Sequence, residues 1–137
     1  FLFTGLSNGS YYLQFDKQNA PEVWYGKTGK EAIEVGSKSV KVQFTYPRGQ
    51  EIIGTYRDAD GTPLGGESVF LYNADGRLLT SSNTGSDGSF LFTGLSNGSY
   101  YLQFDKQGAP EVWYGGTSKQ AIIVNSRDER IAFTYPK

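Results

Sequence analysis

Acidic side chains recur at glycine-containing turns, where their carboxylates are the groups best suited to bind a cation. Asp58 and Asp60 lie in Asp-Ala-Asp-Gly, Asp75 in Asn-Ala-Asp-Gly and Asp87 in Asp-Gly. A Ca²⁺ site needs roughly six to eight converging oxygens, and no stretch here has the loop pattern that supplies them. Asp-Gly is also a favoured hairpin turn without a metal. We therefore expect hairpin turns with no metal or other cofactor, and Ca²⁺ bound by these four residues is the alternative.

Aromatic side chains form the second group with binding potential. Residues 106–118 are predicted to be a loop that carries Trp113 and Tyr114, with Tyr101 exposed on the adjacent strand by alternation. Sugar rings and other proteins pack against exposed Trp and Tyr. The loop can instead fold back over the domain and bury Trp113 there, which is the structural alternative. The candidate contact residues are Tyr101, Trp113, Tyr114, Trp24 and Tyr25.

The composition removes most other chemistry. The 137 residues include no His and no Cys, with 13 basic and 14 acidic side chains. Without His or Cys, the common general base, the thiolate nucleophile and the zinc frameworks are missing, so we expect no catalytic residues and no enzyme activity. The balanced charge argues against nucleic-acid binding, and no apolar run is long enough for membrane insertion.

An internal repeat organises the chain. Residues 1–48 recur as residues 90–137, with 35 of the 48 positions identical, whereas residues 49–89 occur once. Near-identical copies at a fixed offset are the signature of a tandem array. We expect residues 49–137 to be one complete repeat unit, and residues 1–48 to be the C-terminal half of a preceding unit, cut from a longer array.

Period-two alternation of apolar residues, broken by Gly, Asn, Asp and Pro, predicts an all-β unit of about seven strands. The expected strands are residues 52–57, 68–72, 78–82, 90–93, 100–105, 121–124 and 130–135. Glu34 becomes Ile123 and Gln43 becomes Ala132 in the second copy, so those positions face solvent and their neighbours face the core. The expected inward residues are Val69, Leu71, Phe90, Phe92, Leu95, Tyr100, Leu102, Phe104, Ile122, Val124, Ile131, Phe133 and Tyr135, with Ile53 on the opposing wall.

These strands and turns resemble the carboxypeptidase regulatory-like domain, which groups with transthyretin-like and collagen-adhesin B-type modules. The resemblance rests on Ile53-Gly54-Thr55-Tyr56-Arg57-Asp58, on Asp87-Gly88-Ser89-Phe90 and on Gly98-Ser99-Tyr100-Tyr101-Leu102, and it covers residues 49–137. It implies a seven-stranded Greek-key sandwich of the prealbumin or immunoglobulin type. In function, it implies a spacer, stalk or accessory module outside the cell.

Many adhesin modules of this kind carry a Lys–Asn isopeptide bond promoted by an acid in a Tyr-x-Leu-x-Glu strand. Here Phe104 takes the place of the acid, residues 51–58 contain no Lys and the last strand contains no Asn, so we expect no cross-link. Two Asn-Gly-Ser sequences, at Asn8 and Asn97, fit the glycosylation pattern. Turn geometry alone accounts for them.

The sequence thus favours a non-enzymatic structural repeat of an extracellular bacterial surface or appendage protein. Its expected partners are adjacent repeats or copies of itself, with filaments forming through strand edges or unit ends near Trp24 and Trp113. A polysaccharide or another surface protein is a further expected partner. The alternative function is a carbohydrate-binding accessory module of a secreted enzyme. Residues 1–48 contain the equivalents of the last strands only, so we expect them to need a partner that completes them.

Overall fold

The computed structural model describes residues 1–26, 30–46 and 49–136. The chain divides into two compact units. Unit 1 comprises Phe1–Lys17 and Glu22–Pro47, and unit 2 comprises Gln18–Pro21 and Arg48–Lys137. Apart from the short segment 18–21, this division falls where the sequence repeat places it.

Unit 2 is built from antiparallel hairpins and one parallel strand pair. Its strands are β5 (Gln50–Arg57), β6 (Ser68–Asn73), β7 (Leu78–Asn83), β8 (Ser89–Leu95), β9 (Gly98–Lys106), β10 (Ala109–Trp113), β11 (Ile122–Val124) and β12 (Glu129–Thr134). A 3-10 turn, η2 (Gly116–Ser118), separates β10 from β11. The predicted all-β sandwich is confirmed, and β10 is the strand that the sequence did not predict.

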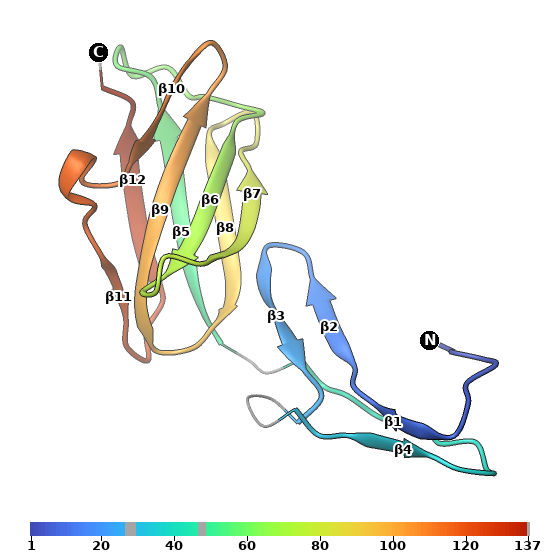
Figure 1. Cartoon of the computed structure of the whole chain (residues 1–137). Helices are drawn as coiled ribbons and strands as arrows, with labels where there is room; N and C mark the ends of the chain where they lie inside the picture. The colour runs from blue at the N-terminus through green and yellow to red at the C-terminus, as the bar shows by residue number, and fades with distance from the viewer. Residues whose placement is uncertain (27–29, 47–48, 137) are drawn as a thin grey trace. The chain divides into compact units, whose positions relative to one another are not determined.

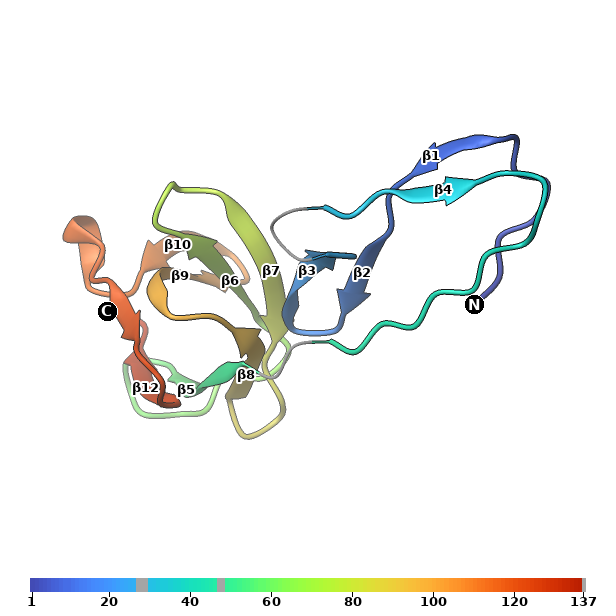
Figure 2. The ribbon, with the colours of Figure 1, turned by 90° about the horizontal axis from the view of Figure 1, so that it is seen from below.

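Two sheets form the layers of unit 2 (Figures 1 and 2). One sheet has the order β10-β9-β6-β7, with β11 also paired to β9, and the other has the order β12-β5-β8. The chain crosses between the sheets after β5, after β7, after β8 and again before β12, which gives the expected Greek-key path. β5 is therefore the central strand of its sheet, antiparallel to β8 and parallel to β12.

Alternate residues of the facing strands fill the space between the sheets. The buried apolar core contains Ile52, Tyr56, Val69, Leu71, Phe90, Phe92, Leu95, Tyr100, Leu102, Phe104, Ile122, Val124 and Tyr135, with Ile131 and Phe133 packed against it. Every predicted inward residue is in this list except Ile53. In β5 it is Ile52, Gly54 and Tyr56 that face inward, so the expected face of this strand was wrong by one residue.

The Asp-Gly turns form as tight reversals. Gly76 and Gly88 have φ values of 82° and 80°, a region that L-residues rarely adopt. A Cβ atom on Gly88 would also lie 2.4 Å from the carbonyl oxygen of Tyr56. Both glycines are therefore required by the backbone, as hairpin-turn chemistry predicts.

Unit 1 retains only part of the strand structure of the matching part of unit 2. The strands of unit 1 are β1 (Gly9–Tyr11), β2 (Gln14–Lys17), β3 (Ala20–Trp24) and β4 (Ile33–Val35), with β1 paired to β4 and β2 to β3. The single long strand β9 thus corresponds to two short strands in the first copy. Residues 1–6 and 40–45, which correspond to β8 and β12, form no strand.

Candidate functional site

An aromatic face lies on the outer side of the sheet β10-β9-β6-β7. Pairing places Tyr72 opposite Tyr101, and Gln103 opposite Trp113. The Tyr72 ring lies 5.0 Å from the Trp113 ring, and the Tyr72 hydroxyl donates a hydrogen bond of 3.1 Å to Oε1 of Gln103. We call Tyr72, Tyr101, Gln103 and Trp113 the aromatic face.

A lysine covers this face. Nζ of Lys119 lies 4.8 Å from the centroid of the Trp113 ring and 5.7 Å from that of Tyr101, within the range of cation–π attraction. Unit 1 repeats the arrangement, with Nζ of Lys30 at 5.0 Å from Trp24 and 5.9 Å from Tyr12. Lys30 and Lys119 are the same residue in both copies although positions 27, 29 and 31 differ. This shared lysine, among positions that differ, is the sequence signal that could have predicted its place beside the aromatic residues.

The structure modifies the predicted aromatic loop. Ala109–Trp113 is an edge strand with a bulge between Ala109 and Val112, so this part of the expected loop was wrong. Pro110 is tolerated in this strand because the outer side of an edge strand forms no ladder hydrogen bonds, so the missing N–H of proline costs none. Trp113 is half-buried on the outer face, and its neighbour Tyr114 turns toward the core, with its ring 6.2 Å from Phe133.

The remaining contact candidates are all half-buried. Tyr101 is on the outer face as predicted, and it is half-buried rather than exposed. Trp24 and Tyr25 are half-buried in unit 1, where the Tyr25 amide donates to the Leu13 carbonyl. The matching bond in unit 2 runs from Tyr114 to Leu102. In both copies, the same backbone hydrogen bond therefore fixes the position of the Trp-Tyr pair.

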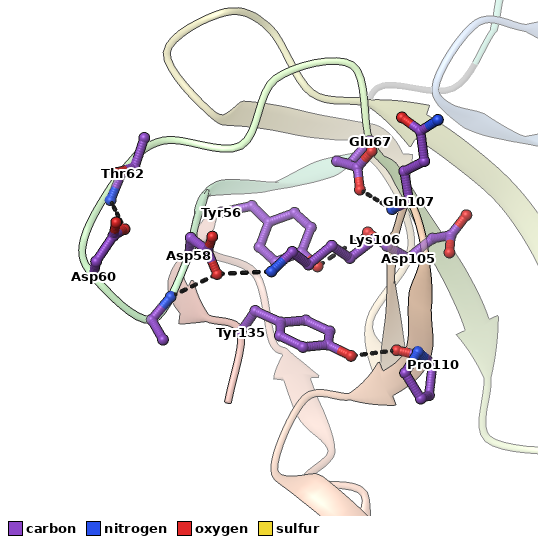
Figure 3. A network of polar contacts seen from close by, with 11 residues as sticks. Tyr56, Asp58, Asp60, Thr62, Glu67, Asp105, Lys106, Gln107, Pro110 and Tyr135 are labelled. Carbon is purple, nitrogen blue, oxygen red and sulfur yellow. Dashed lines mark hydrogen bonds and ion pairs between the residues drawn. The ribbon is translucent and has the colours of Figure 1, made fainter. Parts of the chain in front are cut away.

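An ion pair joins the end of β5 to the end of β9 (Figure 3). Nζ of Lys106 lies 2.9 Å from Oδ1 of Asp58, which also accepts a hydrogen bond from the Ala59 amide. The Lys106 ammonium lies 4.8 Å from the Tyr135 ring, and Nζ of Lys17 similarly lies 5.1 Å from the Tyr46 ring in unit 1. The pair closes one end of the sandwich.

Two tyrosines tie the same end together through main-chain acceptors. The buried Tyr56 hydroxyl donates to the Asp105 carbonyl at 3.0 Å, and the Tyr135 hydroxyl donates to the Pro110 carbonyl at 2.7 Å (Figure 3). Burial raises the pKa of Tyr56 well above its ordinary value, with the Glu67 charge adding to the effect. Tyr56 thus stays neutral and acts as a donor that links the two sheets.

The ion pair is held in its charged form. The hydrogen bond from Lys106 lowers the pKa of the Asp58 carboxyl, and the same bond raises the pKa of Lys106. Amide formation between two such groups needs a neutral amine as the nucleophile. At neutral pH both groups are charged, which favours an ion pair over a covalent bond at this position.

The four acidic residues predicted for the turns lie in three loops, with Asp58 and Asp60 together in the loop between β5 and β6. The Asp60 carboxylate accepts the Thr62 amide, and that of Asp87 accepts the amide and hydroxyl of Ser89; these bonds lower the pKa of both carboxyls. Asp75 lies in the β6–β7 turn, where Asn73 accepts the amides of Asp75 and Arg77. Within residues 1–26, 30–46 and 49–136, no three acidic side chains converge on a common point. The carboxylates of Asp58, Asp60 and Asp87 thus accept hydrogen bonds within their own turns, and in the Asp75 turn the acceptor is Asn73.

Phe104 is fully buried at the position where the resemblance to adhesin modules implied an acid. Its ring stacks on Phe133 of β12 and lies 4.9 Å from Tyr56 of β5. An aromatic cluster thus joins the first, middle and last strands of unit 2. In the Asn97-Gly-Ser turn at the start of β9, the Asn97 side chain accepts a hydrogen bond from the Ser126 amide, so it has a structural role.

Comparison with known proteins places this geometry in a family. The sequence model of the carboxypeptidase regulatory-like domain matches residues 51–133. Serine-aspartate repeat-containing protein D of Staphylococcus aureus (strain Newman) is 25% identical over 130 residues, a match that covers 77% of this chain and 10% of that protein. The chain thus spans about a tenth of the length of this relative.

One solved structure supports the fold, and a second is a similar chain. The Bacillus anthracis TIE protein superposes with a TM-score of 0.50 at 18% identity, covering 95% of this chain and 24% of that one. A minor pilin of Streptococcus agalactiae gives a TM-score of 0.49 at 22% identity, covering 98% of this chain and 65% of that one. Across the described residues, no helix has the length and apolar character needed to cross a membrane.

Proposed function

The chain belongs to the carboxypeptidase regulatory-like domain family, and we propose from this that it is a non-enzymatic, load-bearing repeat of an extracellular bacterial surface or appendage protein. The near-identical copies support the proposal, because tandem arrays add reach one unit at a time. Adjacent repeats or copies of the same chain are its proposed partners. Filament formation through strand edges or unit ends, near Trp24 and Trp113, belongs to the same proposal.

The parallel pairing of β5 with β12 carries this proposal. These are the first and last strands of unit 2, and they pair over six residues, from Ile52–Glu129 to Arg57–Thr134. Tension applied at the start of β5 and the end of β12 pulls the two strands along each other. All the hydrogen bonds of the ladder then share the load, and none is exposed to it alone.

Single-molecule pulling in two geometries tests this function. In the first, handles are fused to the two ends of the chain, so that unit 2 is loaded along the β5–β12 ladder. In the second, one handle is attached at Ala59→Cys and the other at the C-terminus. Ala59 is exposed just beyond β5, and the chain has no native cysteine to compete. This geometry pulls the ladder apart from one end.

We expect a higher rupture force along the ladder than from its end. In the first geometry, the rupture of unit 2 should lengthen the chain by roughly 27 nm. This is the length of the extended chain from Gln50 to Thr134 minus the distance between these two residues in the folded unit. Rupture forces reflect the barrier to unfolding along the pulling direction. Equal forces in the two geometries would contradict a load-bearing role.

Carbohydrate binding is the second candidate function, and the aromatic face is the observation that favours it. Tyr72, Tyr101 and Trp113 present rings on one sheet surface, beside the amide of Gln103. Rings bordered by polar groups stack on sugars. Quenching of Trp fluorescence by added polysaccharide tests this, with Trp113→Ala as the variant that should lose the response. An unchanged spectrum across a panel of polysaccharides would exclude this second function.

A further inference from the structure

Unit 1 exposes apolar side chains that unit 2 buries. Phe1, Phe3 and Leu6 are the first-copy equivalents of core residues. Their exposed fractions are 81%, 60% and 45%, against 3%, 0% and 0% for Phe90, Phe92 and Leu95. A set of exposed apolar side chains on one unit marks an interaction surface.

The rings of this surface already have their core arrangement. Phe15 stacks on Phe44 with centroids 4.0 Å apart, as Phe104 stacks on Phe133 at 4.0 Å. Phe1 meets Phe15 edge-on at 5.7 Å, and the matching pair in unit 2, Phe90 and Phe104, is 5.6 Å apart. Preformed geometry lowers the ordering cost of binding.

The strands missing from unit 1 identify what would cover it. In unit 2, β8 and β12 both pair with β5, and the matching residues 1–6 and 40–45 form no strand. Likewise β9 pairs with β6 over its centre, and its first-copy counterpart is divided into β1 and β2. Every loss of strand structure thus falls where β5 or β6 would lie.

We propose that unit 1 is an acceptor surface for a chain segment that has the sequence of residues 49–89 and is not paired within a repeat unit of its own. This deepens the proposed function, on which it rests. The β5-like strand of the donor lies between residues 1–6 and residues 40–45, antiparallel to the first and parallel to the second. By the register of unit 2, donor Ile52 pairs with Phe3 and Val40, and donor Tyr56 pairs with Phe44.

A second intact copy of the chain is not the occupant. Residues 49–89 occur once per chain, and in unit 2 they are already paired with β8, β9 and β12 of their own copy. Exchange between two copies would cover one half-unit and uncover another, with no net gain in buried surface. The occupant must therefore bring a segment of residues 49–89 that is not already paired.

Hydrogen exchange of the full chain, mixed with a fragment of residues 49–89 fused to a soluble carrier, tests the proposal. We expect exchange to slow by at least about tenfold in residues 1–6 and 40–45, because open edges become paired. Unit 2 should keep its protection, since its own segment is held at high effective concentration. A matched fragment with Ile52→Asp and Tyr56→Asp should leave exchange unchanged.

Three outcomes decide against the proposal. It is overturned if the fragment leaves the exchange of residues 1–6 and 40–45 unchanged, or if the Asp-substituted fragment protects them equally well. It is also overturned if these residues gain protection with rising concentration of the chain alone, which would show that a second copy covers them. Pulling of unit 2 gives its result independently, so failure here and failure of the load-bearing function are distinguishable.

Discussion

The rings of Phe104 and Phe133 stack at a centroid distance of 4.0 Å and an interplanar angle of 7°, joining β9 of one sheet to β12 of the other. Phe15 and Phe44 stack at the same distance with an angle of 1°. The stack is therefore a property of the second half of the repeat itself. It forms both where β5 and β6 are present and where they are not.

Truncating this stack should destabilise unit 2 severely. Phe104 is fully buried, so Phe104→Ala removes ring contacts and leaves a cavity, with an expected loss of about 3–5 kcal/mol in the free energy of unfolding. Urea unfolding followed by circular dichroism measures it. Ile123→Ala, at a side chain that is 55% exposed, is the control and should change stability by less than about 0.5 kcal/mol. Similar losses in both variants would contradict the buried stack.

Gly54 of β5 lies directly against the ring of Phe90. A Cβ atom there would lie 2.1 Å from Cζ of Phe90, so Gly54→Ala should cost about 1–3 kcal/mol through overpacking. Gly36→Ala is the matched control, because a Cβ at Gly36 meets no atom within 4 Å. Combining Gly54→Ala with Phe90→Leu should cost less than the sum of the two single changes. Strict additivity in this cycle would show that the two residues do not contact each other.

The Asp58–Lys106 pair should make stability depend on pH in the acid range. The pKa of Asp58 is lowered below its ordinary value of 3.8 by the bond from Lys106. A depressed carboxyl pKa contributes stability above 3.8 that is lost as pH falls through the folded-state pKa. Asp58→Asn and Lys106→Gln should each flatten the acid side of the stability profile, measured by urea midpoints from about pH 7 to about pH 2. A pH profile identical to that of the unmodified chain would show that the Asp58–Lys106 pair does not contribute to stability.

The chain should carry no covalent cross-link. Phe104 lies where an acid would be needed, and Lys106 and Asp58 are held charged. The intact mass of the purified protein should therefore equal the sequence mass. A mass lower by one ammonia or one water would demonstrate an amide bond, and peptide mapping would locate it.

The sequence alone, read with its two copies side by side, was sufficient to predict most of the core residues. Substitutions such as Glu34 to Ile123 and Gln43 to Ala132 show which face of the last two repeated strands is exposed, and Phe133 follows from them. Phe104 follows from alternation within residues 100–105. β5 occurs once, and Ile52 and Ile53 are both apolar, so neither alternation nor a second copy could distinguish its faces. The burial of Tyr56 was missed for the same reason.

Tertiary context explains the rest of the site. β10 contains Pro110 and a bulge, and it is a strand because β9 offers it an edge. The contact of Tyr72 with Trp113 depends on β6 and β10 lying on either side of β9, which alternation within one strand cannot reveal. Lys119 was recognisable in principle, since it and Lys30 occupy the same position in the two copies.

Residues 49–137 should fold on their own as one complete module. Circular dichroism of that fragment during urea unfolding is the measurement that tests this. We expect a β spectrum without helix and one cooperative transition, because the whole buried core cluster of unit 2 lies within this fragment. Residues 1–48 alone should show no such transition. A random-coil or helical spectrum from residues 49–137 would contradict the claim.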